Sequence, residues 1–289
     1  MGWTQERLVE ELYLFDEETF SALSTGMLSR WERKVVVPSW QRQAALIHFF
    51  QNMSGDALPC MGKLSPESLE KSLCSDGLHR LLGRPPTLYA DIEIGAISGD
   101  DYTLMPLRAF ERAEPLLELH QMIYQRLNPG FTAVSIEKFE KWSLRPGNFF
   151  QILLYKGMFL GLLFALRLKP ETFEDIIHFR KRKNEISEKD FASMDEPASY
   201  YLLSAYALNR DFLAPLLARL YAHFLSHEKS IEKIGFITMQ DDLLRLGNRL
   251  KLENILHRNI EGERVYSMAA SLPQMMRGEE ILRILFPRR

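Results

Sequence analysis

Hydrophobic residues recur at helical spacing through the first fifty residues of the chain. In the stretch 3–15, Leu8, Leu12 and Phe15 lie three or four residues apart, and Thr4 is the expected N-cap. Three further short helices are expected at 17–23, 25–34 and 40–51. The pattern predicts an all-α segment at the start of the chain.

Beyond residue 100, patterns typical of strands and helices alternate. Two apolar runs across 148–169 flank Lys156 and Gly157, which predicts a β-hairpin that turns there. The helix expected at 113–127 carries His120 on its apolar side. Other strands are expected at 102–107, 198–209 and 233–239, helices at 170–179, 210–228 and 240–250, and a last hairpin around 259–264. This alternation predicts a second segment built on a mixed sheet.

A polar connector separates the two segments. Residues 52–64 contain glycine and proline, a capped helix is expected at 65–83, and Gly-Arg-Pro-Pro at 83–86 is the best domain boundary. A chain of 289 residues is also longer than one ordinary core. We therefore predict a helical domain at 1–52, a connector with one helix at 53–86, and a sheet domain at 87–289.

Composition indicates a packed globular protein outside the membrane. The chain is 46% hydrophobic and 26% charged, and its net charge of -2 excludes no class of partner. The longest apolar stretch, 152–166, is interrupted by Lys156 and Gly157 and falls short of the ~20 residues that cross a bilayer. No secretory signal pattern opens the chain, and Cys60 and Cys74 suit reduced thiols, so we expect a cytoplasmic location.

A pair of histidines and a run of basic residues are each interpreted as structural rather than as binding sites. His223 and His227 lie four residues apart, but they lack the glutamate of a His-Glu-x-x-His motif and a third ligand, so we expect no metal site. The basic run at 178–185 is interpreted as a solvated loop. The alternative for this run is contact with DNA phosphates or an anionic ligand.

Residues 24–34, Ser-Thr-Gly-Met-Leu-Ser-Arg-Trp-Glu-Arg-Lys, raise the question of DNA binding. A helix-turn-helix needs a second helix whose inner face is apolar and whose outer face carries short polar or basic side chains. Residues 17–23 and 25–34 are expected to form its two helices. Leu28 and Trp31 form the inner face. The stretch from Leu28 to Pro38 resembles the third helix and following turn of the Cro and phage-repressor (Xre-like) helix-turn-helix family.

This resemblance implies that a homodimer binds double-stranded DNA. It implies groove or phosphate contacts by Ser29 and Arg30, packing by Trp31, and backbone contacts by Lys34 and Arg42. Residues 1–52 hold five Lys and Arg against seven Asp and Glu, but most of the acids precede the bases, so one face can be positive. The expected DNA-binding residues are Thr25, Gly26, Ser29, Arg30, Arg33, Lys34 and Arg42.

The order of elements after residue 100 resembles the GNAT acyltransferase fold. That family holds the pyrophosphate of acyl-CoA on a glycine-containing turn between its fourth strand and the next helix. The corresponding residues, 209–217, contain no glycine, and the strand 198–209 contains no carboxylate to act as a base. We therefore expect no cofactor, with acyl-CoA disfavoured, and lean against enzymatic activity. A candidate ligand cavity is lined by Tyr200, Tyr201, Tyr206 and Arg210.

The sequence thus predicts an α+β protein, with an all-α helix-turn-helix domain followed by a GNAT-like mixed-sheet α/β domain. The favoured function is a DNA-binding transcriptional regulator whose GNAT-like domain senses a small-molecule or acyl ligand, or forms the dimer. One alternative is an active acyl-CoA-dependent N-acyltransferase with an accessory helix-turn-helix. The other is a protein-interaction regulator of the antitoxin or anti-activator type.

Overall fold

The computed structural model describes residues 3–58, 68, 102–128, 132–208, 210–260 and 262–278. The boundary expected at 83–86, both cysteines and, apart from Ser68, the helix expected at 65–83 lie outside these residues. The division of the chain into three parts therefore stays a prediction.

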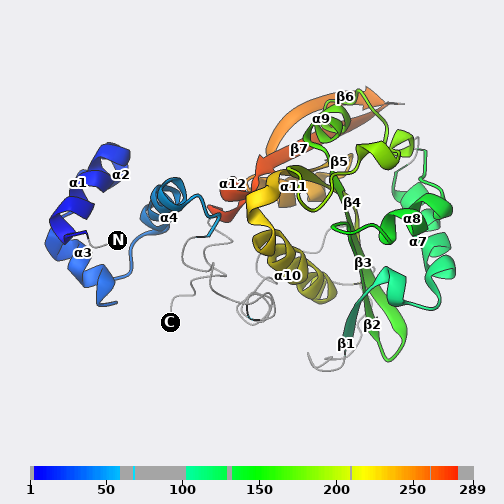
Figure 1. Cartoon of the computed structure of the whole chain (residues 1–289), viewed down its shortest axis with the longest axis horizontal. Helices are drawn as coiled ribbons and strands as arrows, with labels where there is room; N and C mark the ends of the chain where they lie inside the picture. Colours follow the sequence, from blue (N-terminus) through cyan, green and yellow to red (C-terminus); the bar gives the residue numbers. More distant parts are fainter. Residues whose placement is uncertain are drawn as a thin grey trace.

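Four helices form a unit at the start of the chain (Figure 1). The helix expected at 17–23 is a single turn, because Ser24 already serves as the N-cap of the helix that follows. At each helix start, a Ser, Thr or Asp side chain accepts a hydrogen bond from the backbone N–H three residues later. The helices are α1 (Gln5–Phe15), α2 (Glu17–Phe20), α3 (Thr25–Glu32) and α4 (Trp40–Ser54).

The last of these helices packs against two cores. Phe49 of α4 is buried with Leu12 and Phe20 in the core of the helical unit. Ile47, two residues earlier, packs instead into a core that lies on the sheet. Near the end of α4, Gln51 Nε2 donates to the carbonyl oxygen of Pro273 at 3.1 Å. Helix α4 is therefore shared between the helical unit and the sheet.

A seven-stranded mixed sheet organises the region beyond residue 100, in the order β1-β2-β3-β4-β5-β7-β6. Neighbouring strands are antiparallel except for the parallel pair β4–β5. The mixed sheet and the order of strands and helices along the chain confirm the predicted α+β class and GNAT-like mixed-sheet fold. The strands are β1 (Tyr102–Pro106), β2 (Phe149–Tyr155), β3 (Met158–Leu168), β4 (Ala198–Ala207), β5 (Ile231–Thr238), β6 (Glu253–Ile260) and β7 (Glu263–Ser271).

Helices cover both faces of this sheet. On one face, Phe139 and Trp142 of α8 pack with Phe164 of β3, next to α7 and α9. On the other face, Leu216 and Phe224 of α10 pack with α11 and α12. The sequence prediction missed α8 and α12, which are short. The helices are α7 (Ala113–Leu127), α8 (Ile136–Ser143), α9 (Pro170–Ile177), α10 (Arg210–Ser226), α11 (Asp241–Arg249) and α12 (Leu272–Met276).

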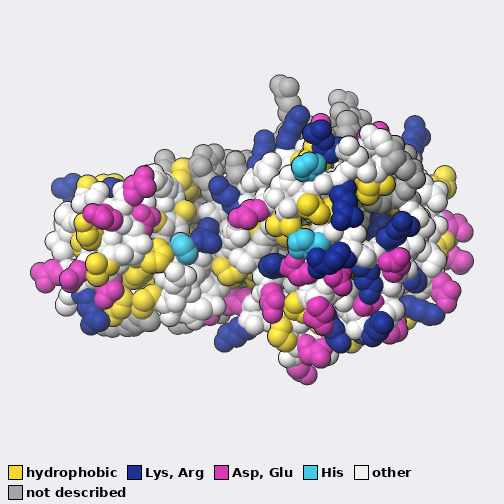
Figure 2. Space-filling model, turned by 90° about the horizontal axis from the view of Figure 1, so that it is seen from above, with side chains coloured by type: hydrophobic (Ala, Val, Ile, Leu, Met, Phe, Trp, Pro, Cys, Tyr) yellow, Lys and Arg dark blue, Asp and Glu magenta, His cyan; other side chains and the backbone are white. Residues whose placement is uncertain are grey.

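The surface of the larger, sheet-containing part mixes charges of both signs. Figure 2 shows Lys and Arg side chains intermingled with Asp and Glu over the face that it presents. Within the described ranges, none of the helices has the length and apolar character that a bilayer crossing requires.

Candidate functional site

Strands β4 and β5 run side by side over only the first part of their length. Their register joins Tyr200 to Ile234 and Tyr201 to Gly235, and no later pair follows among the described residues. Beyond this point, β4 continues along β3, and β5 continues along β7. The two strands therefore part and form a fork in the middle of the sheet.

A cavity of about 130 Å³ lies in this fork. Because the sheet is open here, the walls of the cavity come from helices on both of its faces. On the side of α10 and α11 the lining is mostly apolar, with the polar Gln240 at the start of α11, and on the side of α7 it carries several polar groups. The apolar lining includes Leu202, Leu213, Leu217, Phe236, Leu243 and Leu246, and the polar lining includes His120, Tyr124, Lys183, Ser204 and Gln240.

A β-bulge in β4 positions Ser204. On β3, Phe164 pairs with Ser204, while the next residue, Ala165, pairs with Leu202, so Leu203 is the extra residue. Successive strand residues normally point to opposite faces, but the bulge lets Leu203 and Ser204 both face the α7 side. As a result, Ser204 Oγ lies 2.7 Å from His120 Nε2.

His120 is the residue in this cavity with the most distinctive chemistry. Its side chain is only 6% exposed and is surrounded by the rings of Phe139 and Phe164, at 5.0 Å and 5.6 Å. Burial, together with the nearby charge of Lys183, lowers the pKa of His120 to about 4, so the imidazole is neutral at pH 7. Its Nδ1 is buried and has no hydrogen-bond partner among the described residues. A ring that donates from Nε2 to Ser204 keeps a lone pair on Nδ1 and can accept a proton there.

Lys183 reaches the same side of the cavity from a short 3-10 turn, Lys183–Glu185. Its Nζ donates to the hydroxyl of Tyr124 and lies 3.6 Å from the centre of that ring. Desolvation lowers the pKa of Lys183 to about 7. The Tyr124 ring is also 6.2 Å from the ring of His120, so the same aromatic ring lies near both the amine and the imidazole.

The sequence had placed Lys183 in a solvated basic run at 178–185, and this interpretation is wrong for two of its residues. Lys183 lines the cavity, and Lys181 Nζ lies 2.6 Å from Asp190 Oδ1. Burial alone would raise the pKa of Asp190, but hydrogen bonds from Lys181 and Ser187 hold it at about 2. Arg182 is exposed. In this run, Lys181 therefore forms an internal ion pair, Lys183 lines the cavity, and Arg182 faces solvent.

The tyrosines predicted to line a cavity are separated by the fold. Tyr201 and Tyr206 line the fork. Tyr200 lies outside its lining, where its hydroxyl donates to the carbonyl oxygen of Gly147 at 2.8 Å and lies 2.7 Å from His223 Nε2. Arg210 begins α10, and its side chain is outside the described residues.

Two histidines near the end of α10, His223 within the helix and His227 just after it, take part in hydrogen bonds. Besides the contact of His223 with Tyr200, His227 Nδ1 lies 2.9 Å from the carbonyl oxygen of His223. Within the part of the chain that the structure describes, no group of three side chains is arranged to hold a metal ion.

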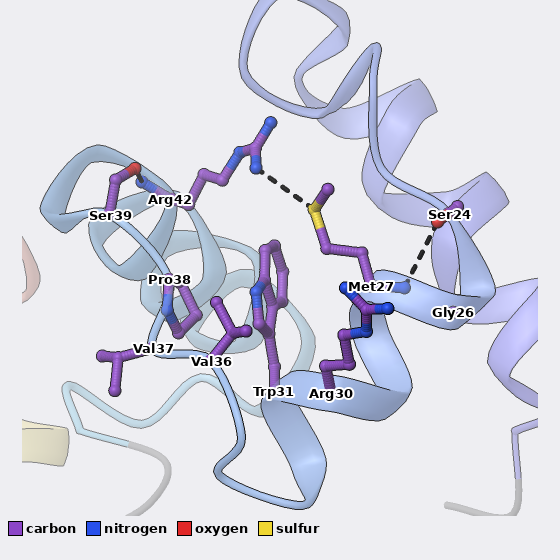
Figure 3. Close-up of a pocket in the computed structure, with 10 residues that line it drawn as sticks. All are labelled: Ser24, Gly26, Met27, Arg30, Trp31, Val36, Val37, Pro38, Ser39 and Arg42. Carbon is purple, nitrogen blue, oxygen red and sulfur yellow. Dashed lines mark hydrogen bonds between the residues drawn. The ribbon is translucent and has the colours of Figure 1, made fainter.

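Most of the residues predicted to bind DNA lie on or just after α3, and Figure 3 shows three of the seven, Gly26, Arg30 and, on α4, Arg42. Leu28 is buried and Trp31 is half-buried, as an inner face requires. A groove of about 400 Å³ lies between α3 and the turn before α4, where Arg30, Pro38 and Arg42 contribute to its walls. Of the other predicted residues, Gly26, Arg33 and Lys34 are exposed, and Thr25 and Ser29 are half-exposed.

Arg42 makes internal contacts as well as facing this groove. Its guanidinium lies 5.8 Å from the centre of the Trp31 ring, and its Nε donates to the carbonyl oxygen of Thr19 at 3.4 Å. The dashed line between Arg42 and Met27 in Figure 3 marks a further contact, from Nη1 to Met27 Sδ at 3.3 Å. These contacts hold α4 against α3, so only part of this side chain remains available for a phosphate.

The helix that is tied to the end of α3 is α1. Gln5 Nε2, in the first turn of α1, donates to Glu32 Oε2 at 2.5 Å. The one-turn α2 lies in the connection between these two helices. The contact between Gln5 and Glu32 fixes the start of α1 against the end of α3.

Comparison with known proteins gives distant likenesses only. No protein-family model matches the chain, and no curated protein matches it in sequence. Similar solved structures include the AHL synthase LasI (13% identity, TM-score 0.42, covering 61% of this chain and 93% of that one). They also include FeeM, an N-acyl amino acid synthase from uncultured soil microbes (10%, 0.41, 61% and 93%), and aminoglycoside 6'-acetyltransferase type Ii (14%, 0.36, 59% and 97%). Likenesses this distant leave the function to be inferred from the site.

Proposed function

We propose that the sheet region binds an acyl thioester in the fork between β4 and β5 and transfers its acyl group to a primary amine. The supporting observation is the cavity in this fork, whose lining joins an apolar wall to a neutral His120, and the Nδ1 of this ring is buried without a hydrogen-bond partner among the described residues. The sequence ranked this activity below DNA binding because 209–217 holds no glycine for a pyrophosphate turn and the strand 198–209 holds no carboxylate base. His120 of α7 is the base in its place.

The proposed reaction exchanges a thioester for an amide. The amine nitrogen attacks the carbonyl carbon, the C–S bond breaks, and His120 Nδ1 takes the proton that the nitrogen loses. Burial raises the pKa of Tyr201 and of Tyr206, so each hydroxyl keeps its proton near neutral pH and can donate it to the departing sulfur. The edge of β4 that faces the fork offers backbone N–H groups to the oxygen that becomes negative.

The size of the cavity restricts the length of the acyl group more than it restricts the thiol that carries this group. Its volume of about 130 Å³ is comparable to the ~150 Å³ of an apolar cavity that binds benzene, so chains of about two to six carbons fit. Because 209–217 contains no glycine, a CoA pyrophosphate finds little of the close backbone contact that a phosphate loop provides. We therefore expect recognition of the acyl group and thioester rather than of the nucleotide.

The test is amide formation by the full chain. Acetyl, butyryl and hexanoyl thioesters of CoA and of N-acetylcysteamine are offered with a mixture of primary amines, and amide and thiol are quantified. We expect equal amounts of both products, with rates on the two carriers within about tenfold of each other. His120→Gln should lower kcat/KM by about 10²- to 10⁴-fold, the usual contribution of a general base.

The matched control is His257→Gln, which alters an exposed histidine on β6 and should leave the rate unchanged. If no thioester is consumed, or if the two variants behave alike, the fork is not the site of acyl transfer.

We also propose DNA binding by the helical unit as a second function. It is supported by α3, which buries Leu28 while Arg30 and Arg33 stay exposed, and by the tie between Gln5 and Glu32 that fixes α1 against α3. Two copies of the chain would then read a palindromic duplex.

Binding to duplex DNA is measured at increasing salt concentration. We expect log Kd to rise steeply with log salt, and the double variant Arg30→Ala, Arg33→Ala to weaken binding and flatten the slope. Arg7→Ala on α1 is the control. A flat salt dependence in the unaltered protein would rule out this function.

A further inference from the structure

Ser204 and His120 form a hydrogen-bonded pair on the wall of the fork. Ser204 Oγ lies 2.7 Å from His120 Nε2, and both side chains line the cavity. Ser204 is half-buried, whereas His120 is almost fully buried. A hydroxyl group within hydrogen-bond reach of an imidazole is the arrangement that activates serine as a nucleophile. The pair therefore has the geometry of a nucleophile and its base.

The His120 ring can form this pair in either of its neutral tautomers. In the amide formation proposed above, Nε2 carries the proton and Nδ1 is the base. Among the described residues, Nδ1 has no hydrogen-bond partner that would fix the proton on one of the two nitrogens. In the other tautomer, Nε2 accepts the hydrogen bond from the Ser204 hydroxyl group and can take its proton.

The surroundings of Ser204 suit an acyl group as its reaction partner. The cavity wall on the side of α10 and α11, which includes Leu213 and Leu217, fits a short alkyl chain. The edge of β4 that faces the fork offers backbone N–H groups to a carbonyl oxygen that becomes negative. An acyl group bound in the fork therefore meets a nucleophile and hydrogen-bond donors on the same strand.

Beyond the transfer to amines, we propose that Ser204 and His120 hydrolyse short-chain acyl thioesters and acyl esters through a covalent acyl-serine. This activity shares the acyl cavity of the transfer proposed above, but it needs no amine. Ser204 Oγ attacks the carbonyl carbon while its proton passes to His120 Nε2. The C–S bond of a thioester, or the C–O bond of an ester, then breaks, and the departing sulfur or oxygen takes the proton from Nε2.

Water completes the reaction. A water molecule attacks the carbonyl carbon of the acyl-serine, and one of its protons passes to His120 Nε2. The Ser204 oxygen leaves and takes this proton back, which releases the carboxylic acid. The net reaction consumes one thioester or ester and one water, and it yields one acid and one thiol or alcohol.

The experiment uses the full chain without any added amine. Butyryl-N-acetylcysteamine and p-nitrophenyl butyrate are offered separately, and thiol, p-nitrophenol and butyrate are quantified. Because p-nitrophenol is a good leaving group, Ser204 should be acylated faster than water regenerates it, and a burst of about one p-nitrophenol per chain should precede steady turnover. Protein denatured during turnover should carry a butyryl group, which peptide mass spectrometry should locate on Ser204.

The variant Ser204→Ala removes the nucleophile. It should lower both rates of hydrolysis by at least about 100-fold and abolish the burst and the acyl-serine, with thermal unfolding to confirm that the variant folds. The matched control is Ser199→Ala, which removes the hydroxyl group of a buried serine of the same strand that is not part of the cavity lining. This control should keep the burst and the acyl group on Ser204.

The outcomes separate this inference from acyl transfer to amines. If amide is formed but the butyryl group is absent from Ser204, or if hydrolysis survives in a folded Ser204→Ala, the inference fails while acyl transfer stands. If the thioester is hydrolysed through Ser204 but no amine is acylated, the inference stands and the transfer fails. If the thioester is consumed in neither reaction, both fail.

Discussion

At the scale of single residues, burial decides which groups near the fork carry charge. His120 and Lys183 would both be charged in acidic solution, but apolar surroundings favour their neutral forms. The sequence showed His120 as a polar residue on an apolar helix face and Lys183 as part of a basic run. Neither pattern tells which side chains face a common cavity, because that depends on how α7 and the 3-10 turn pack against the sheet.

His120 should make the stability of the protein depend on pH. Its pKa is about 4 in the folded protein and ~6.5 when unfolded, so below pH 6.5 the unfolded chain binds a proton that the folded chain excludes. The free energy of unfolding should therefore fall as the pH drops from 7 to 5, with about 2 kcal/mol of the loss due to His120.

Urea unfolding at pH 7 and pH 5 measures this effect. His120→Gln should lose about 2 kcal/mol less than the unaltered protein over this interval, because glutamine binds no proton. His223, whose pKa burial also lowers to about 4, remains in both proteins and contributes equally. An identical pH dependence in the two proteins would show that His120 is not held neutral.

Lys34 should be replaced by glycine with a gain in stability. It follows α3 with a φ of 59°, in the left-handed region that side chains with a Cβ adopt at a cost of about 1 kcal/mol. Lys34→Gly should therefore raise the midpoint of thermal unfolding, and Arg33→Gly, at an ordinary φ of -81°, should lower it. Equal effects would contradict the strain assigned to Lys34.

At the scale of elements, the sequence predicted features whose cause is local and missed those that depend on a partner strand. The hairpin at Lys156 and Gly157 was predicted because a two-residue turn has its own residue preferences, and both residues have positive φ. The bulge at Leu203 is a shift in register between β4 and β3, and no residue pattern within β4 predicts it. The fork likewise exists only between β4 and β5. The fold class and two of the lining tyrosines, Tyr201 and Tyr206, could therefore be predicted, but the fork and the place of His120 in it could not.

Gly235 marks the point where the fork begins, and the fold has no space for a side chain there. A Cβ on Gly235 would collide with the carbonyl oxygen of Met268 and lie 2.9 Å from the ring of Phe173. Gly235→Ala should destabilise the protein by about 1 to 3 kcal/mol, as overpacking of a core does.

Thermal unfolding compares this variant with Gly26→Ala, where the added Cβ would meet only Ser24 Oγ, at 3.9 Å. Alanine suits the helix α3 better than glycine, so Gly26→Ala should be neutral or slightly stabilising. If Gly235→Ala proves as stable as the unaltered protein, the sheet is looser at the start of the fork than described.

At the scale of the whole molecule, α4 connects the helical unit to the sheet through a buried amide. Gln51 Nε2 donates to the carbonyl oxygens of Ala57, at 2.6 Å, and Pro273, at 3.1 Å. Gln51→Ala leaves both carbonyl groups without this donor and should cost about 1 to 3 kcal/mol of stability. Gln41→Ala, on the exposed start of the same helix, should cost far less. Equal losses of stability in the two variants, measured by thermal unfolding, would show that this link contributes little.

The central claim, that the acyl group occupies the fork, is tested most directly by filling the fork. Ala205 of β4 lines the cavity, and Ala205→Phe adds a ring there while leaving His120 and Ser204 in place. The rate of amide formation from butyryl-N-acetylcysteamine is measured for both proteins, with thermal unfolding to confirm that the variant folds. We predict amide formation by the unaltered protein and a loss of at least about 100-fold in a folded Ala205→Phe, since occupied volume excludes the acyl chain. Equal rates in the two proteins, or no amide from either, would contradict the claim.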